Sequence, residues 1–266
     1  MTIKSLIRLF LLLFLVSLTS GLSKTVVLRC DFGTPKCDPE FRACYFCNIQ
    51  NMNVREKNVK VSSLKATSSD EGVNDTQILI MENQIVYFMP KQFTNFVPKT
   101  KVLKIISSGL RELSFNDLKE FHHLTELYVT GNELTFLPFN LLQIDANIAQ
   151  IDFSGNKIKN VGINFFYSKN IYGAKFLNNV CINTSSDSLE DGVSGVAKQL
   201  EIKCPPTHPM IIDQINWLQN ESKLMREKLA KCYPQGFLQT TTNRPCRKRA
   251  EVDFRGQVDL TTLCRD

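Results

Sequence analysis

A pattern of apolar residues recurs every 23–25 residues through the middle of the chain. Its five copies, each with the polar residue near its end, are Ile78, Ile80, Asn83 and Ile85; Leu103, Ile105, Ser108 and Leu110; Leu124, Leu127, Val129, Asn132 and Leu134; Ile148, Ile151, Phe153, Asn156 and Ile158; and Ile171, Ala174, Phe176, Asn179 and Cys181. A fixed period of this length predicts units that stack on one another, because one unit cannot bury its own apolar face. Alternating strands of a β-sandwich are the alternative, but they explain neither the period nor the recurring asparagine.

Residues 75–181 resemble leucine-rich repeats, since the copy from Leu124 to Leu134 fits the template L-x-x-L-x-L-x-x-N-x-L. The resemblance implies an α/β fold: a right-handed solenoid with a parallel β-sheet on its concave face and the apolar side chains inside. It also implies that the asparagines bond backbone groups where each strand ends. Ser108 departs from asparagine, so we expect its turn to be less well held.

In this family the residues that flank the two strand leucines face the concave surface, because side chains alternate along a strand. The first three copies then predict an apolar patch on that face, which is typical of a contact with a partner. The expected ligand-binding residues are Leu79, Met81, Val102, Lys104, Ile106, Tyr128, Asp152 and Lys175. The alternatives are that a loop over residues 48–74 covers the patch, or that these are simply residues that favour strands.

The first 21 residues have the pattern of a secretory signal peptide: Lys4 and Arg8 flank an apolar run that is followed by small residues up to Gly21. A membrane anchor is the alternative, but a span needs about 20 apolar residues. No later run reaches that length, so we expect a secreted protein without a membrane span. Glycosylation sequons at Asn74, Asn183 and Asn220 agree with export. Without the two basic residues of the signal the net charge falls from +6 to +4, which does not by itself imply a nucleic-acid partner.

Nine cysteines fit an oxidising compartment, and because their number is odd, one thiol either stays unpaired or pairs with another chain. Residues 22–74 carry four of them and are expected to cap the repeats; among three pairings we favour Cys30–Cys47 around Cys37–Cys44. The segment resembles the start of short secreted leucine-rich-repeat proteins of flies and mosquitoes. Zinc at Cys44-Tyr-Phe-Cys47 is the rival, and we expect no metal. Residues 182–205 are expected to form a C-terminal cap closed by Cys181–Cys204, in resemblance to other such caps.

From 206 to 232 the apolar period changes to alternating threes and fours, which predicts an amphipathic helix. The helix is expected either to fold back on the repeats or to form a short coiled coil between two chains, with Cys232 as the candidate for an intermolecular disulfide. Residues 233–266 read as a flexible basic tail, in which Arg247-Lys248-Arg249 could serve proteolytic processing or contact an anionic surface.

No catalytic fingerprint occurs, and His122, His123 and His208 are expected to be surface residues, so we expect no enzyme and no cofactor. The layout of signal, cysteines, repeats and heptad helix resembles mosquito immune leucine-rich-repeat proteins. That resemblance implies an extracellular recognition or adaptor module that binds another protein, in innate immunity. The alternatives are a disulfide-linked structural or carrier dimer, and a precursor that releases a C-terminal peptide at 247–249.

Overall fold

The computed structural model describes residues 24–33, 45–67, 75–166, 171–186 and 193–232, the last four of these in backbone only. The chain divides into two compact units at Pro205, and each unit is described by itself. The first unit contains β1 (Thr25–Gly33), β2 (Phe46–Ile49), β3 (Asn53–Val54), β4 (Lys60–Ala66), β5 (Ile78–Glu82), β6 (Ile85–Val86), the 3-10 helix η2 (Phe93–Asn95), β7 (Val102–Ile106), α2 (Phe115–Leu118), β8 (Glu126–Thr130), β9 (Phe136–Leu137), β10 (Gln150–Asp152), β11 (Asn160–Val161), β12 (Gly173–Lys175), β13 (Ser185–Ser186) and α3 (Ser194–Lys203). The second unit contains α4 (His208–Cys232).

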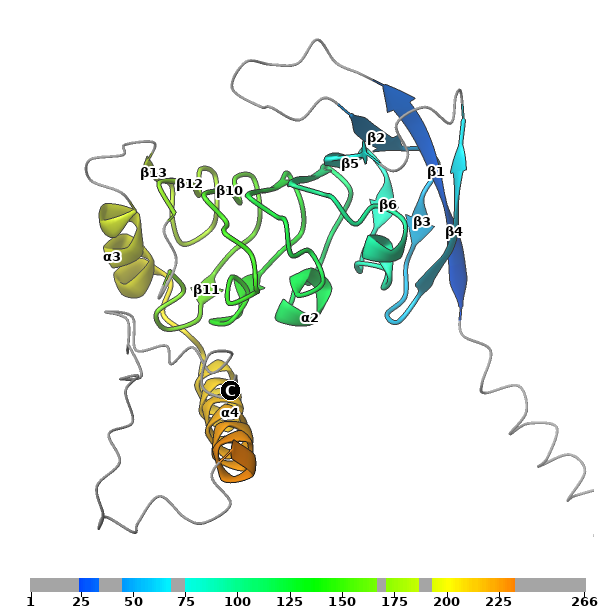
Figure 1. The fold of residues 1–266 in the computed structure, drawn as a ribbon. Coiled ribbons are helices and arrows are strands. Elements are labelled where there is room, and N and C mark those ends of the chain that lie inside the picture. The colour runs from blue at the N-terminus through cyan, green and yellow to red at the C-terminus, as the bar shows by residue number, and fades with distance from the viewer. Residues whose placement is uncertain (1–23, 34–44, 68–74, 167–170, 187–192, 233–266) are drawn as a thin grey trace, which may run out of the picture. The chain divides into compact units, whose positions relative to one another are not determined.

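A largely parallel nine-stranded sheet organises the first unit, which is therefore an α/β structure (Figure 1). Its strand order is β13-β12-β10-β8-β7-β5-β2-β1-β4. Five strands, from β5 to β12, follow one another in sequence order and pair in parallel; Leu79 faces Leu103, Leu103 faces Leu127, and Leu127 faces Ile151. Partners from Leu79 to Ile151 are therefore 24 residues apart in the sequence, and the next pair, Ile151 with Ala174, is 23 apart, which is the period of the apolar pattern.

The core lies on one side of this sheet and is built by alternate strand residues. Leu103, Ile105, Leu127 and Val129 are completely buried, whereas the residues between them point to the other face. Continuing the chain beyond each strand, Leu113, Leu137 and Val161 recur with the same spacing and are also buried. The strand residues and those beyond the strands form one continuous buried cluster.

A column of polar side chains satisfies the backbone where the strands end. Asn132 accepts hydrogen bonds from the Ser108 and Leu110 N–H groups at 3.1 Å each and donates to the Ile105 carbonyl at 2.7 Å. Asn156 and Asn179 make equivalent bonds one and two strands further on. The column thus removes the cost of unpaired buried peptide groups.

The prediction that Asn83 is the member of this column in the first copy is wrong. Gln84 holds that position, since its side chain accepts from Met52 N–H and donates to the Glu82 carbonyl. Asn83 precedes the column and has a left-handed backbone with φ 54°, as Gly131 does with φ 65°. Asparagine and glycine are the residues that tolerate this conformation best, so an asparagine appears one place early.

Ser108 shortens the column by one amide but stays within it. Its hydroxyl lies 3.0 Å from the Met81 carbonyl and 2.9 Å from the Ile106 carbonyl, and it accepts from Gln84 N–H. A hydroxyl has one proton and the amide of Asn132 has two. The serine can therefore donate to only one carbonyl at a time. This is the physical reason to expect that its turn is held less well than the turns with asparagine.

The N-terminal segment extends the sheet with its own strands. β2 pairs in parallel with β5, and β3 with β6, so residues 45–59 form one further rung. β1 then pairs antiparallel with β2 and parallel with the edge strand β4. The expected disulfide Cys30–Cys47 joins β1 to β2 and is confirmed, with both cysteines fully buried. Cys37 and Cys44 lie outside the described residues.

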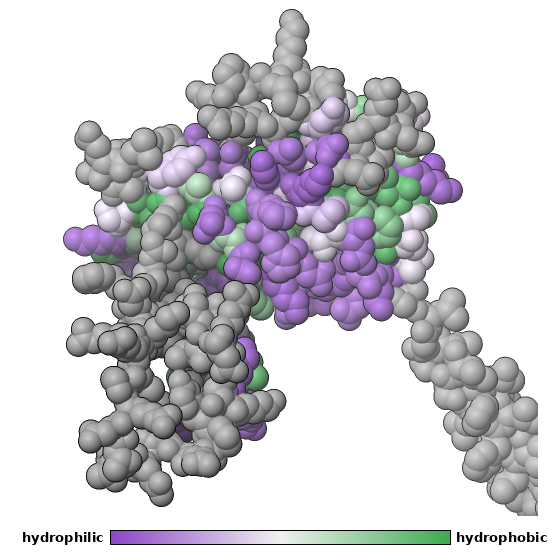
Figure 2. All heavy atoms as spheres, viewed as in Figure 1, coloured by the Kyte–Doolittle hydropathy of each residue, from purple (hydrophilic) through white to green (hydrophobic). Residues whose placement is uncertain are grey.

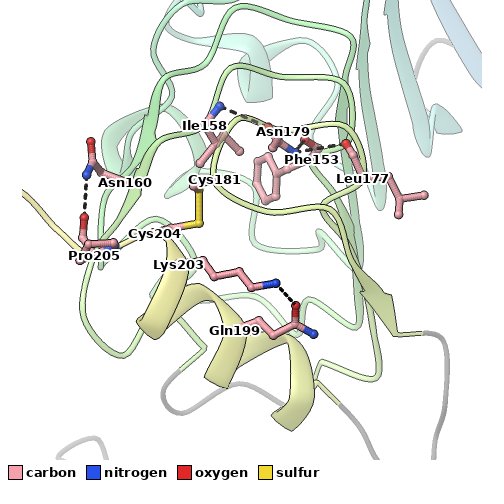
Figure 3. Close-up of a disulfide and its surroundings, with 10 residues drawn as sticks. All are labelled: Phe153, Ile158, Asn160, Leu177, Asn179, Cys181, Gln199, Lys203, Cys204 and Pro205. Carbon is pink, nitrogen blue, oxygen red and sulfur yellow. Dashed lines mark hydrogen bonds between the residues drawn. A yellow bond between two sulfur atoms is a disulfide. The ribbon is translucent and has the colours of Figure 1, made fainter.

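The C-terminal end of the sheet is covered by α3, which lies beside β13 (Figure 1). α3 buries Val196 and Leu200, and the expected disulfide Cys181–Cys204 ties its end to the last rung, which confirms this pairing (Figure 3). The Asn160 side-chain amide donates to the Pro205 carbonyl at 2.6 Å and fixes the end of the unit.

The second unit contributes the amphipathic helix that the heptad pattern predicts. Ile215, Leu218 and Met225 belong to the apolar stripe, and 44, 51 and 38% of their surfaces are exposed. No described helix is both long enough and apolar enough to cross a bilayer.

Candidate binding surface

The side of the sheet opposite the core carries the residues that alternate with the buried ones, and we call it the open face. The pairing registers align its residues across the strands. One row crosses the sheet through Asn48, Ile80, Lys104, Tyr128, Asp152 and Lys175. Two further rows flank it: Phe46, Ile78, Val102, Glu126, Gln150 and Gly173, and, at the last residues of β5, β7 and β8, Glu82, Ile106 and Thr130.

The structure brings six of the eight expected ligand-binding residues to this face and removes two. Leu79 and Met81 are fully buried in the core, so the prediction that they are exposed on the concave face is wrong. Residues 78–81 are all apolar, and a shift of one residue exchanges the two faces of a strand. The open face of β5 instead carries Ile78, Ile80 and Glu82.

An apolar cluster forms at the N-terminal half of the open face. Ile78 and Val102 are buried there, with Phe46, Ile80 and Tyr128 packed against them. Val102 is thus on the expected face. Because it is only 2% exposed, it packs against its neighbours and offers little surface to a partner. Phe46 crosses β1 at Gly33, where a Cβ would lie 2.5 Å from the phenyl ring. Glycine at this point makes room for the ring.

Tyr128 stands at the border between the apolar cluster and a charged region. Its hydroxyl donates to a carboxylate oxygen of Glu126 at 2.7 Å, and the Lys104 ammonium lies 5.3 Å from the centre of its ring. Burial and the Glu126 carboxylate raise the pKa of Tyr128, so the phenol stays protonated at neutral pH. Burial also raises the pKa of Glu126, although the Tyr128 hydrogen bond and Lys104 oppose this rise.

The C-terminal half of the open face is polar. Asp152 lies beside Tyr128 in the register and accepts a hydrogen bond from Ser154 N–H at 2.8 Å, and Lys175 follows on β12. Ile106 is half-buried at the end of β7. The open face therefore presents an aromatic ring between an apolar cluster and side chains of both charges, an arrangement suited to a protein surface.

Sequence reasoning missed Phe46, and it placed Ile78 and Ile80 in the core, whereas they lie on the open face. Phe46 belongs to a rung that lies outside the repeat period, because the spacing from Cys47 to its partner Leu79 is 32 residues and not 24. Cys47, Ile49, Met52 and Val54 are all buried, so their apolar spacing carried the signal for this rung.

Two of the three expected glycosylation asparagines lie within the described residues. Asn183 and Asn220 are exposed, and the Asn183 side chain accepts from Asn178 N–H at 2.9 Å. Asn74, the Cys232 side chain and residues 247–249 lie outside what the structure describes. His122, His123 and His208 are exposed. No group of three metal-ligating side chains occurs within the described ranges.

Comparison with protein-family models, curated proteins and solved structures gives no match to this chain.

Proposed function

We propose that the chain is a secreted leucine-rich-repeat protein, a right-handed solenoid whose open face binds another extracellular protein. The 24-residue offset between the parallel strands β5, β7, β8 and β10 and the Asn132, Asn156 and Asn179 column support the repeat assignment. The two disulfides are consistent with an oxidising compartment. We further propose that it is an adaptor or recognition module in innate immunity, with no enzymatic activity and no cofactor.

The observation that carries the binding proposal is the fixed position of Tyr128. Tyrosine is enriched at the energetic centres of protein interfaces, where it supplies a large contact area with few rotatable bonds. Here the Glu126 hydrogen bond and the Lys104 contact hold the ring before any partner arrives. A side chain that is already ordered loses less entropy on binding.

The experiment compares the extracellular proteins captured by the wild-type chain with those captured by Tyr128→Ala and Lys104→Glu. Lys119→Glu is the control, because it makes the same charge change at an exposed residue at the end of α2, outside the open face. We expect a protein that wild type and control retain and the open-face variants lose. Loss of a central tyrosine anchor typically costs about 2 kcal/mol or more, or roughly thirtyfold in affinity. Equal capture by all four proteins would refute the proposal.

A second candidate function, a structural or carrier dimer, is favoured by α4. Ile215, Leu218 and Met225 repeat by three and seven along this helix and are exposed, as a coiled-coil seam would be in a single chain. Mass measurement of the secreted protein with and without reduction tests this candidate. A disulfide-linked dimer that reduction dissociates supports it, and a monomer under both conditions, at all concentrations, contradicts it.

A further inference from the structure

A second surface of the repeat unit carries a stack of two arginines and one tyrosine. Arg55, Tyr87 and Arg111 occupy the same register on three consecutive rungs, since Val54 pairs with Val86 and Arg111 N–H donates to the Tyr87 carbonyl. The guanidinium carbon of Arg111 lies 3.9 Å from the centre of the Tyr87 ring, and that of Arg55 lies 5.9 Å from it. Both cations thus converge on one aromatic ring.

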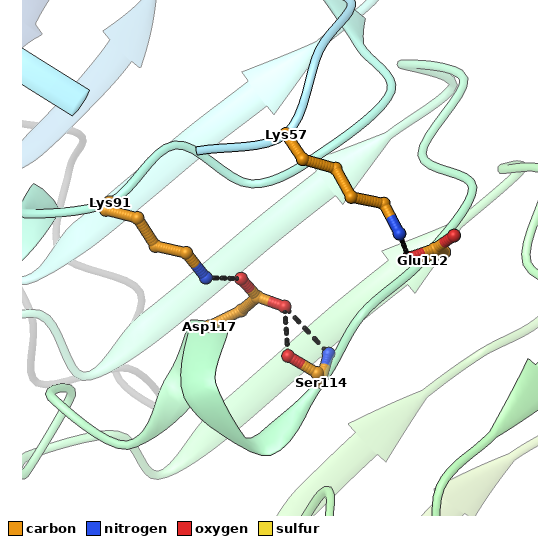
Figure 4. Close-up of polar contacts among 5 residues, drawn as sticks. All are labelled: Lys57, Lys91, Glu112, Ser114 and Asp117. Carbon is orange, nitrogen blue, oxygen red and sulfur yellow. Dashed lines mark hydrogen bonds and ion pairs between the residues drawn. The ribbon is translucent and has the colours of Figure 1, made fainter. Parts of the chain in front are cut away.

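Neither arginine is neutralised by a carboxylate within the described part of the chain, although carboxylates lie close by in the sequence. Glu56 pairs with Lys24, Glu112 pairs with Lys57 (Figure 4), and Glu133 pairs with Lys157. The nearby acids are therefore occupied by lysines. Arg55 and Arg111 are exposed residues, with an aromatic contact for each and one hydrogen bond from Arg55 to Asn53.

The same register continues along the unit to a third cation. Thr135 follows Arg111 by 24 residues, and Lys159 pairs next to it, because its N–H donates to the Thr135 carbonyl. We call Arg55, Tyr87, Arg111, Thr135 and Lys159 the basic row. Neighbouring rungs are about 4.8 Å apart, so the backbone positions of Arg55, Arg111 and Lys159 are spaced by roughly 10 Å on alternate rungs. Among described residues Lys159, like the two arginines, forms no ion pair.

Figure 2 shows that hydrophilic side chains cover much of the described surface in that view, so a charged row is not unusual by itself. What distinguishes the basic row is its regular spacing and the absence of carboxylate partners, while the lysines beside it are paired. Guanidinium groups present a planar fork of donors that fits a tetrahedral oxyanion, and a tyrosine between them limits their motion.

We propose that the basic row binds a sulfated polysaccharide. An extended chain with sulfate groups at regular intervals is complementary to cations at regular intervals, and such chains occur in the oxidising, extracellular compartment that the disulfides indicate. Arg55 and Arg111 bind one or two sulfates above the edge of Tyr87, and Lys159 contacts a sulfate further along the chain. This surface is separate from the open face, so the protein can hold a polysaccharide and a protein partner together.

The test measures binding of the full chain to heparin, and to heparin from which the sulfates have been removed, over a range of salt concentrations. Arg55→Gln with Arg111→Gln removes two cations of the basic row. Lys101→Gln with Lys119→Gln is the matched control, because both residues are exposed and lie outside the row. A variant in which Arg247, Lys248 and Arg249 are all replaced by Gln separates the contribution of the basic tail from that of the basic row.

We expect the double arginine variant to bind heparin at least tenfold more weakly than wild type, and the slope of log Kd against log salt to fall by roughly one for each lost contact. The matched control and the tail variant are expected to keep most of the affinity, and desulfated heparin is expected not to bind. The proposal is overturned if the arginine and control variants lose equal affinity, if the tail variant alone abolishes binding, or if desulfated heparin binds as well. Unchanged melting temperatures establish that the variants are folded; where the Gln pair unfolds, Arg→Lys at both positions replaces it and is expected to weaken binding although the charge is kept.

Discussion

Replacement of Asn132 by alanine tests the polar column that joins the repeats. The Asn132 side chain is 2% exposed and bonds four backbone groups: Ser108 and Leu110 N–H, and the Ile105 and Thr130 carbonyls. The Thr130 carbonyl keeps the Ser107 N–H as a partner at 2.9 Å. Alanine therefore leaves three buried groups without this partner, at about 1–3 kcal/mol each.

We expect Asn132→Ala to lower the free energy of unfolding by about 3 kcal/mol or more, a large fraction of the 5–15 kcal/mol that is usual for a domain. Urea denaturation followed by circular dichroism measures this change from the midpoint and the slope. Asn147→Ala is the control, because Asn147 is exposed, and it should change stability by less than about 0.5 kcal/mol. A loss below about 1 kcal/mol for Asn132→Ala would show that the column does not hold the repeats together.

Three further variants test other parts of the structure. Replacing Cys181 and Cys204 by alanine opens a loop of 23 residues and should reduce stability by about 3 kcal/mol, measured by denaturation of the non-reduced protein; no change would mean that the bridge does not constrain the chain. In Gly162→Ala the new Cβ would lie 2.3 Å from the Phe139 backbone nitrogen, so two rungs must separate and the melting temperature should fall by several degrees, whereas an unchanged melting temperature would argue against this close approach. Burial raises the pKa of Glu126 in the folded state, so this group favours folding most below its ordinary pKa and loses that contribution as pH rises through the higher folded value. Glu126→Gln does not titrate, so its stability relative to wild type should increase between about pH 4 and pH 7 in paired denaturation curves, and a constant or opposite difference would contradict the burial argument.

The repeat period was predictable because burial selects for it directly. Each apolar residue of the copies from Leu103 to Phe176 that was expected inside is buried, since a rung with a polar residue there would leave it unpaired in the core. In the first copy the same reasoning fails. The run Ile78-Leu79-Ile80-Met81 satisfies either face, so the pattern does not fix the register, and Asn83 strengthened the wrong choice.

The sequence predicted on which face of the sheet the candidate site lies, but it did not predict all of the residues that form it. Lys104, Ile106 and Tyr128 lie on the expected face because they alternate with buried residues on β7 and β8. Phe46 comes from a rung with a 32-residue spacing, and its position over Gly33 depends on the antiparallel pairing of β1 with β2. Such a long-range pairing has no periodic signal in the sequence.

Site-specific photo-crosslinking tests the central claim, that the open face binds an extracellular protein, most directly. A photoreactive phenylalanine analogue at Ile80 or Ile106 would lie on the open face, and the same analogue at Lys119 is the control outside it. After irradiation in the extracellular fluid of its source, our account predicts one and the same crosslinked protein from the two open-face positions and none from Lys119. A crosslinked partner from Lys119 alone, or no crosslink from either open-face position, would contradict it.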